Sequence, residues 1–532
     1  MRRFCSYGPI IMDSHYYAPR KELIDTAYTQ LVGENPLEGG HYITVWAPRQ
    51  SGKTWVMQQI LFQLQKDPRF DVLKINLEHL KDEKNVGKII DGIAEEIGLG
   101  LGKTFKGIRT KKEFQQIFRK GVMDKPLVLI LDEFDALPDE GINAVVCAFR
   151  NIYINRADEI GKTTGQKTYL LHGVALIGVR SVLGIKNMKG SPFNVQRSLY
   201  IPNLTYDEVK EIFKWYEKES GQDISGEVID RVYNECSGQP GLTCWFGELL
   251  TEKYNKDKTK PISMKEWEYT YMYASSGLPN NTVLNIIEKA DKEPYKDKVL
   301  ELFQTDKKNI FRFDDEELNF LYMNGIIDIE ESHDMKLYSK FSCPFIQKRL
   351  FNYFSNEIFD TLDRLVDPFE NLDDAITETS LNIPNIIKRY RKYLLENKEW
   401  LFKEAPRRKD LRIFEAVYHF NLYRYLSDLL EEWKAVVIPE FPTGNGKVDI
   451  LIKYGGKLYG LELKSFKTER AYKEALHQTA VYGRRLGLKE MSLIFFIEAI
   501  DEENKKKFEA EYIDRDEDGQ ITVKPVFVPV LS

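Results

Sequence analysis

The sequence YITVWAPRQSGKTWVMQQILFQLQK, residues 42–66, joins a short apolar run to an amphipathic segment through a loop that ends in Gly-Lys-Thr. The apolar run at 42–47 predicts a strand, and the residues after Gly52 predict a helix. The loop matches the pattern GxxxxGK[ST], with Ala47 in the first glycine position. Its backbone N–H groups and the helix N-terminus together suit a phosphate group. The segment therefore predicts a phosphate-binding loop formed by Gln50, Ser51, Gly52, Lys53 and Thr54.

A second motif at the expected distance supports an ATP site. LVLILDEFD at 127–135 is an apolar strand that delivers Asp132 and Glu133 to its carboxyl end, where α/β sheets bind ligands. Lys53 is expected to reach the β- and γ-phosphates of ATP, and Thr54 to join the Mg²⁺ shell. Asp132 is expected to hold the Mg²⁺, while Glu133 polarises the attacking water. The alternatives, a chance GKT on a surface loop and a solvated acidic pair, do not explain the two motifs together.

Further apolar runs at 71–77 and 173–179 alternate with helix-length segments, which predicts βαβ units and a parallel sheet. The run at 173–179 ends at Arg180, which is expected either to sense the γ-phosphate or to form a surface ion pair. Arg197 is a weaker candidate for an arginine finger supplied to a neighbouring subunit.

Four motifs carry a family resemblance: APRQSGKT, LDEFDAL, SPFNVQRSLYIPNLTYDEV (191–209) and CSGQPGL (236–242). Over about residues 15–350 the chain resembles AAA-like P-loop ATPases allied to the archaeal origin-recognition and STAND families. The resemblance implies a helical lid in which Pro240 lies against the nucleotide. It also implies a winged helix at 313–351, either bound to DNA or, as its acidic helix at 315–323 favours, packed on the nucleotide domain.

KVDILIKYGGKLYGLELKSF, residues 447–466, predicts a β-hairpin whose turn is Gly455-Gly456. With that turn, paired residue numbers sum to 911, so Asp449 faces Glu462. Two carboxylates in this position repel each other, and a divalent cation between them would turn this unfavourable interaction into a favourable one. Alternation along the second strand places Lys464 on the same face as Glu462.

The spacing D-x12-E-x-K resembles nucleases of the PD-(D/E)xK type over about residues 411–500, although the usual proline before the aspartate is absent. The resemblance implies that Asp449 and Glu462 hold Mg²⁺ (or Mn²⁺), and that Lys464 positions the nucleophile or neutralises developing charge. Glu415 is a candidate to complete the metal shell, with Gln478 and Tyr482 as supporting polar residues; the alternative for each is a structural or solvent-facing role. The alternative is an ordinary hairpin with an exposed ExK.

The composition limits the remaining possibilities. The net charge of −6 means that any nucleic-acid contact must be local, and the stretch 385–412 offers ten Lys/Arg against four acids. This stretch is either a phosphate track with interleaved aromatics or the solvated face of a linker. The five scattered cysteines favour reduced thiols. Without an apolar run of membrane length or a secretory signal, the expected location is cytoplasmic, with no membrane partner.

The expected architecture is a multidomain α/β chain with five parts. They are a P-loop ATPase core (1–204), a helical lid (205–258), a winged helix (259–355), a basic helical linker (356–410) and an α/β PD-(D/E)xK domain (411–532). The expected function is an ATP-binding and ATP-hydrolysing, metal-dependent DNA endonuclease of prokaryotic defence or mobile elements. DNA and either a homo-oligomer or an activating protein are the expected partners. The alternatives are an ATP-switched DNA-binding protein with a non-cleaving nuclease fold, and a STAND-type signalling ATPase.

Overall fold

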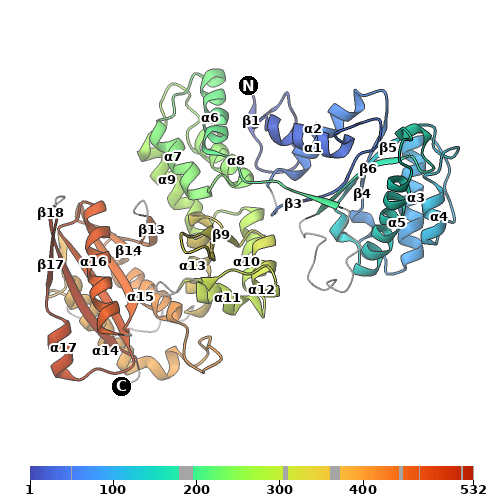
Figure 1. The fold of residues 1–532 in the computed structure, drawn as a ribbon. Helices are drawn as coiled ribbons and strands as arrows, with labels where there is room; N and C mark the ends of the chain where they lie inside the picture. The colour runs from blue at the N-terminus through green and yellow to red at the C-terminus, as the bar shows by residue number, and fades with distance from the viewer. Residues whose placement is uncertain are drawn as a thin grey trace. The chain divides into compact units, whose positions relative to one another are not determined.

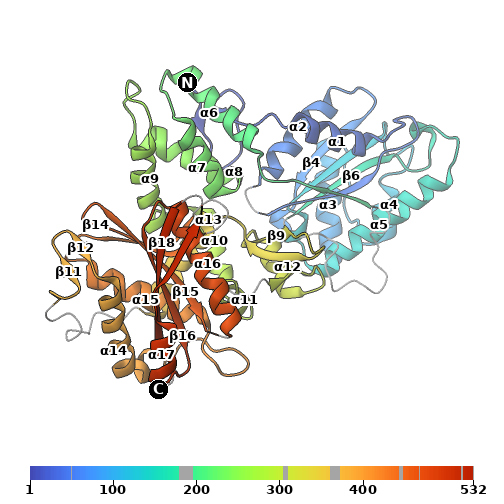
Figure 2. The same ribbon diagram turned by 60° about the vertical axis from the view of Figure 1, so that its left-hand side comes forward.

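The computed structural model describes residues 1–48, 51–178, 196–303, 309–359, 372–442, 447–466, 468–516 and 519–530. Its residues group into two compact units (Figures 1 and 2). The first unit is Met1–Tyr271 with Tyr322–Gly325, and the second is Met272–Leu321 with Ile326–Ser532. Each unit contains its own large sheet and its own candidate site.

The first unit is built on a five-stranded parallel sheet, which confirms the fold class expected for this region. Its strand order is β4 (Asp71–Asn76), β5 (Leu127–Asp132), β6 (Leu171–Gly178), β3 (Tyr42–Trp46) and β7 (Gln196–Tyr200). All six residues of β5 are buried, as its uninterrupted apolar sequence requires of a strand covered on both faces.

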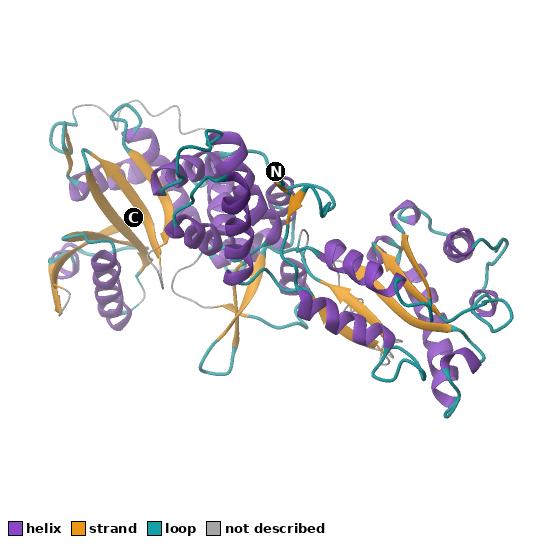
Figure 3. Ribbon diagram, turned by 90° about the horizontal axis from the view of Figure 1, so that it is seen from above, coloured by secondary structure: helices purple, strands orange, loops and turns teal. Residues whose placement is uncertain are grey.

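Helices cover both faces of this sheet, as seen from above in Figure 3. On one face Val128 and Ile130 of β5 share a core with helices α1 (Lys21–Val32) and α2 (Lys53–Gln65). On the other face the alternate residues of β5 pack with α3 (Val86–Leu101), α4 (Lys111–Gln116) and α5 (Asp139–Asp158). The two faces follow directly from the two-residue period of a strand.

A helical subdomain completes the first unit, where the sequence predicts the lid. It contains α6 (Tyr206–Ser220), α7 (Gly226–Cys236), α8 (Pro240–Glu248), a π-helical turn (Leu249–Tyr254) and the start of α9 (Met264–Ser276). The N-terminal strands β1 (Arg3–Phe4) and β2 (His15–Tyr16) pair in parallel. Phe4 packs its ring 5.2 Å from that of Phe213 on α6, so the chain start is anchored to these helices.

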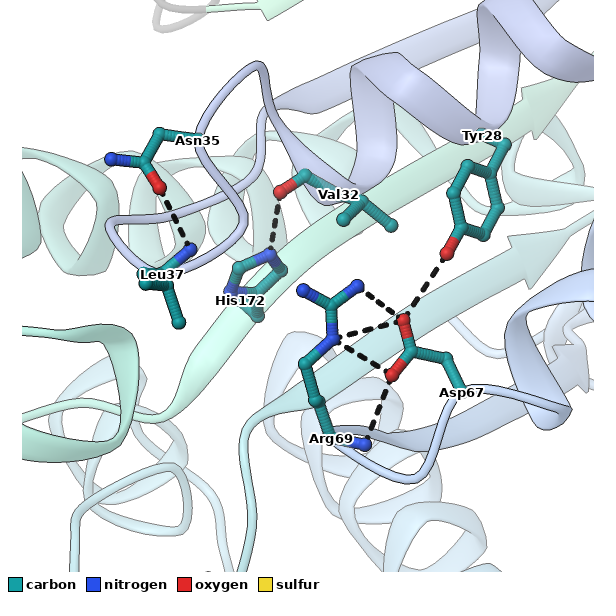
Figure 4. A network of polar contacts seen from close by, with 7 residues as sticks. All are labelled: Tyr28, Val32, Asn35, Leu37, Asp67, Arg69 and His172. Atoms are coloured by element: carbon teal, nitrogen blue, oxygen red, sulfur yellow. Dashed lines mark hydrogen bonds and ion pairs between the residues drawn. The ribbon is translucent and has the colours of Figure 1, made fainter.

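Polar contacts, of which that of His172 is buried, lie around the end of α1, the segment after α2 and the start of β6 (Figure 4). The ring of the fully buried His172 lies 2.9 Å from the Val32 carbonyl and 2.8 Å from the Thr164 hydroxyl. Nearby, Asp67 accepts hydrogen bonds from Arg69 and Tyr28. Burial lowers the pKa of His172 to about 3, so this ring is neutral at physiological pH.

The second unit begins with helices and a small antiparallel sheet. The helices are α10 (Asn281–Ala290), α11 (Tyr295–Leu302), α12 (Glu316–Met323) and α13 (Pro344–Ile358). The last two residues of α12 and the two residues after it, Tyr322–Gly325, group with the first unit. The strands β8 (Asn309–Ile310), β10 (Leu337–Phe341) and β9 (Ile327–Glu331) follow the order β8-β10-β9. The predicted helix at 315–323 and the two-stranded wing are therefore present as α12 and β9–β10. Whether they act as a winged helix stays a prediction.

A six-stranded mixed sheet forms the core of the second unit. Its order is β13 (Val436–Pro442), β14 (Lys447–Tyr454), β15 (Lys457–Ser465), β16 (Glu490–Ile497), β18 (Gly519–Pro529) and β17 (Tyr512–Asp516). The strands β15, β16 and β18 run parallel, and the other neighbours pair antiparallel. Packed around the sheet are α14 (Ile383–Leu401), α15 (Glu415–Leu430), α16 (Glu469–Arg485) and α17 (Glu502–Phe508), with the short pair β11 (Ile376–Thr377) and β12 (Ser380–Leu381).

The basic stretch 385–412 is largely helix α14, and this helix packs against the sheet. Arg391 donates to the Phe527 carbonyl of β18 at 3.0 Å. The aromatic side chains Tyr390 and Tyr393 are buried, so they fill the core and do not form a stacking surface for bases.

All five cysteines are free thiols. Within the described parts of the chain, no helix combines the length and the apolar character needed to cross a membrane.

Candidate nucleotide and metal sites

The loop between β3 and α2 holds Lys53 as the first residue of the helix. Gly52 adopts φ 86°, a left-handed conformation that favours glycine and turns the chain into α2. The Lys53 ammonium donates to the carbonyls of Ala47 at 2.7 Å and Pro48 at 2.8 Å, and the Ser51 hydroxyl donates to Pro48 at 2.8 Å. Lys53 therefore folds back over its own loop, and Thr54 beside it is exposed.

Asp132 and Glu133 lie at the carboxyl end of β5, as the sequence predicts. Asp132 is 6% exposed, and one carboxylate oxygen accepts the Glu133 N–H at 3.1 Å. Glu133 adopts φ 53°, which is rare for a residue with a side chain and marks local strain at this turn.

Lys74 is a partner of Asp132 that sequence reasoning missed. Its ammonium lies 2.8 Å from the second carboxylate oxygen of Asp132. Lys74 lies on β4, which pairs in parallel with β5 so that Lys74 is opposite Ile130 and Asn76 is opposite Asp132. The only signal in the sequence was a lysine inside the otherwise apolar run DVLKINL, and the neighbouring strand could not be known from that run alone.

The other predicted nucleotide residues lie in separate places. Gln50 and Arg180 fall outside the described residues. Pro240 is the first residue of α8, where the Gln239 side chain caps the helix by accepting from the Leu242 N–H. Arg197 forms an exposed ion pair with Glu34 at 2.8 Å.

Two links tie the lid to the rest of the first unit. Gly238 adopts φ 67°, and its carbonyl accepts the Leu204 N–H at 2.8 Å. Arg20, which the sequence analysis did not single out, precedes α1; its guanidinium contacts Glu208 of α6 at 3.2 Å and the Asn203 carbonyl at 3.2 Å. The turn that contains Pro240 is thus fixed to the segment that follows β7.

These residues fit a nucleotide with Mg²⁺. α2 presents its N-terminus and Lys53 to the loop, which is the arrangement that binds phosphate in proteins. Asp132 supplies a carboxylate at the end of β5 in the same sheet, and the Lys74 ammonium balances its charge.

The hairpin of the second site has the register that the sequence predicts. The pairs run from Ile450 with Leu461 to Tyr454 with Lys457, so the partner numbers sum to 911. Gly455 and Gly456 have φ 55° and 73°, as a type I′ turn requires. Asp449 and Glu462 stand one step beyond these pairs, and Asp449 accepts the Leu463 N–H at 2.7 Å.

Asp449, Glu462 and Lys464 are all buried, at 3%, 2% and 5% exposure. The Lys464 ammonium lies 3.0 Å from a Glu462 carboxylate oxygen. The alternative of an exposed ExK on an ordinary hairpin is therefore wrong. Removing these charges from water costs free energy that one ion pair does not fully repay, so stability alone does not favour the arrangement.

Glu415 is the first residue of α15 and reaches the end of β15. Its carboxylate accepts the Ser465 N–H at 3.1 Å, and His419 lies one helical turn later with its Nε2 at 3.9 Å from the same oxygen. Gln478 donates to Tyr482 at 2.6 Å on the exposed side of α16.

In the portion of the chain that the structure describes, no three His, Cys, Asp or Glu side chains are grouped as a metal site. The role of Glu415 as a third metal ligand stays a prediction. Two carboxylates still fit Mg²⁺, because this ion commonly keeps several waters and takes only one or two protein carboxylates.

Comparison with known proteins matches residues 37–161 to a family described as an AAA domain. No curated protein matches the chain. Among solved structures, a Walker-type ATPase of Pyrococcus abyssi has a TM-score of 0.42 at 12% identity, over 65% of this chain and 99% of that chain. Cdc6p of Pyrobaculum aerophilum has a TM-score of 0.35 at 15% identity, over 66% of this chain and 98% of that chain. The Aeropyrum pernix ORC1 protein, in complex with DNA, has a TM-score of 0.33 at 14% identity, over 66% of this chain and 94% of that chain. Residues 37–161 are an AAA-type P-loop ATPase domain.

Proposed function

We propose that this chain is a metal-dependent DNA endonuclease of the PD-(D/E)xK type whose activity is controlled by its AAA-type ATPase domain. The observation that carries the proposal is the burial of Asp449, Glu462 and Lys464 at neighbouring positions of β14 and β15. A protein gains nothing in stability from such a group, and a phosphodiester-cleaving site needs these residue types together.

In the second site the chain's own residues would divide the work. Asp449 and Glu462 would hold Mg²⁺ or Mn²⁺, which activates a water molecule and offsets charge on the phosphate. Lys464 would turn its ammonium from Glu462 toward the attacked phosphate. Glu415 would fix the end of β15 through the Ser465 N–H, which keeps Lys464 in place.

In the first site Lys53 would exchange its contacts with the Ala47 and Pro48 carbonyls for the phosphates of ATP. Thr54 and Asp132 would hold the accompanying Mg²⁺, and Glu133 would orient the attacking water. We also assign Gln50 and Ser51 to the loop around the phosphates, Arg180 to the γ-phosphate and Pro240 to the lid side of the nucleotide.

The test is cleavage of plasmid and linear DNA by the purified full chain, with Mg²⁺ or Mn²⁺ and with or without ATP. Lys464→Ala is expected to abolish cleavage while ATP hydrolysis continues. Lys53→Ala is expected to abolish hydrolysis and the effect of ATP on cleavage. Lys473→Ala is the matched control, because this lysine of α16 is 73% exposed and only loosely paired with Glu469.

Cleavage that persists at the parental rate in Lys464→Ala would refute the nuclease assignment. DNA binding that responds to ATP, without cleavage under either metal, would favour the second candidate, an ATP-switched DNA-binding protein.

A further inference from the structure

A cavity of about 630 Å³ opens in the second unit beside the end of β15. Glu415 and Ser465 line one side of it, and Ser465 directly follows the buried Lys464 in the sequence. Arg407, Arg408 and Arg412 line another side. A recess that carries three arginines and is lined by the residue next to Lys464 in the sequence is suited to a polyanion that continues beyond the reacting group.

The arginines belong to a tight turn, residues 407–413, which we call the arginine hairpin. Arg407 pairs with Ile413 across it, and the Arg408 N–H donates to the Arg412 carbonyl at 2.7 Å. The Arg407 guanidinium donates to the carbonyls of Leu411 and Phe402 at 3.2 and 3.3 Å. Arg407 therefore shapes the hairpin, which positions the other two arginines at the recess.

Arg408 and Arg412 are only weakly engaged within the protein. The Arg408 side chain is 43% exposed and lies 4.0 Å from Asp410. The Arg412 side chain is 68% exposed and pairs with Glu498 at 3.2 Å. Exposed ion pairs of this kind contribute little to stability, so a phosphate can replace the two carboxylates at small cost.

The opposite wall of the recess is aromatic. Tyr418 stacks on Phe496 with ring centroids 5.3 Å apart at 22°, and Phe466 contributes a second partly exposed ring. Burial raises the pKa of Tyr418 to about 12, so its hydroxyl keeps its proton and remains a hydrogen-bond donor. The volume lies in the range of pockets that hold one small molecule, which suits one nucleotide and excludes a duplex.

We propose that this recess seats one unpaired nucleotide of the substrate strand, with its phosphate on Arg408 and Arg412 and its base toward Tyr418. The proposal rests on the proposed nuclease and specifies its substrate as DNA with a single-stranded end or flap. Aromatic and arginine contacts recognise a base only after it has left the stack, so a blunt duplex lacks the group that fits.

The test measures binding, which does not depend on cleavage. Full-length Lys464→Ala protein is titrated into fluorescein-labelled oligothymidylate and into a labelled blunt duplex, and anisotropy is followed at several salt concentrations. Adding Arg408→Gln and Arg412→Gln is expected to weaken single-strand binding about tenfold or more, and to lower the salt slope by about 0.7 for the one lost phosphate contact. Duplex binding is expected to change less than twofold.

The matched control carries Lys392→Gln and Lys473→Gln, two cations of the same unit whose side chains are 78% and 73% exposed and which do not line the recess. Equal losses in this control, or parental single-strand binding by the arginine variant, would overturn the proposal. If the arginine variant loses single-strand binding but the parent protein never cleaves DNA, the proposed recess is supported and the proposed nuclease is refuted. The arginine substitutions are also made with Lys464 intact. If that variant cleaves flapped DNA at the parental rate, the proposed nuclease is supported and the proposed recess is refuted.

Discussion

At the scale of single residues, His172 has a measurable effect on stability. Its Nε2 donates to the Val32 carbonyl, so its Nδ1 accepts from the Thr164 hydroxyl, which in turn accepts from Arg156 at 2.8 Å. Protonating Nδ1 would break this chain of contacts in a buried site. The folded pKa of about 3 lies below the unfolded value of about 6.5.

Between these two values the unfolded chain binds more protons, so stability falls as the pH falls from about 6.5 toward 3. We expect a slope of up to about 1.4 kcal/mol per pH unit from this group, measured as the urea midpoint of the first unit. Asp67 contributes to the slope only below about pH 3.8, because its pKa is lowered from 3.8 in the unfolded chain to about 2. His172→Gln is expected to flatten the slope and the exposed His79→Gln to leave it unchanged; an unaltered slope in His172→Gln would contradict the assignment.

At the scale of elements, the sequence predicts what depends on local pattern. The apolar run of β5, the loop before α2 and the register of the β14–β15 hairpin follow from spacing within one segment. The Lys74–Asp132 pair and the recess beside Ser465 depend on which segments become neighbours, and no local period encodes that. Because a local pattern does not show which segments become neighbours, the sequence predicts a linker where α14 lies, although the tyrosines of α14 are buried in the structure.

The turn before α8 offers a test at this scale. A Cβ at Gly238 would lie 2.0 Å from the Leu204 carbonyl oxygen, and the residue also adopts φ 67°. Gly221, at the end of α6, has a similar φ of 71° but no atom within 4 Å of a Cβ. Gly221→Ala is expected to cost about 1 kcal/mol, from the left-handed backbone alone.

Gly238→Ala is expected to cost about 3 kcal/mol or more, because a steric overlap with backbone adds to the same strain. It should also weaken ATP binding, since the turn fixes the start of α8 to the segment after β7. Thermal unfolding and nucleotide titration of both variants measure these effects. Equal losses of stability in the two variants would show that the Leu204 contact does not hold the turn.

At the scale of the whole molecule, the two candidate sites lie in different compact units. The nucleotide loop belongs to the first unit, and Asp449 and Glu462 belong to the second. A ligand that binds only the folded state stabilises the unit that binds it, by about 2.7 kcal/mol at a concentration one hundred times its Kd. Each ligand should therefore act on its own unfolding transition.

Differential scanning calorimetry of the full chain checks this expectation. ATP with Mg²⁺ should raise the transition of the first unit, and Lys53→Ala should remove that shift. Mn²⁺ alone should raise the transition of the second unit, and Asp449→Asn should remove this shift as well. In EDTA, Asp449→Asn should unfold at a slightly higher temperature than the parent, since one of two opposed carboxylates is gone while the Leu463 N–H keeps its acceptor. If Asp449→Asn instead unfolds at a lower temperature than the parent in EDTA, Asp449 stabilises the fold. The main physical argument for the metal site would then be lost.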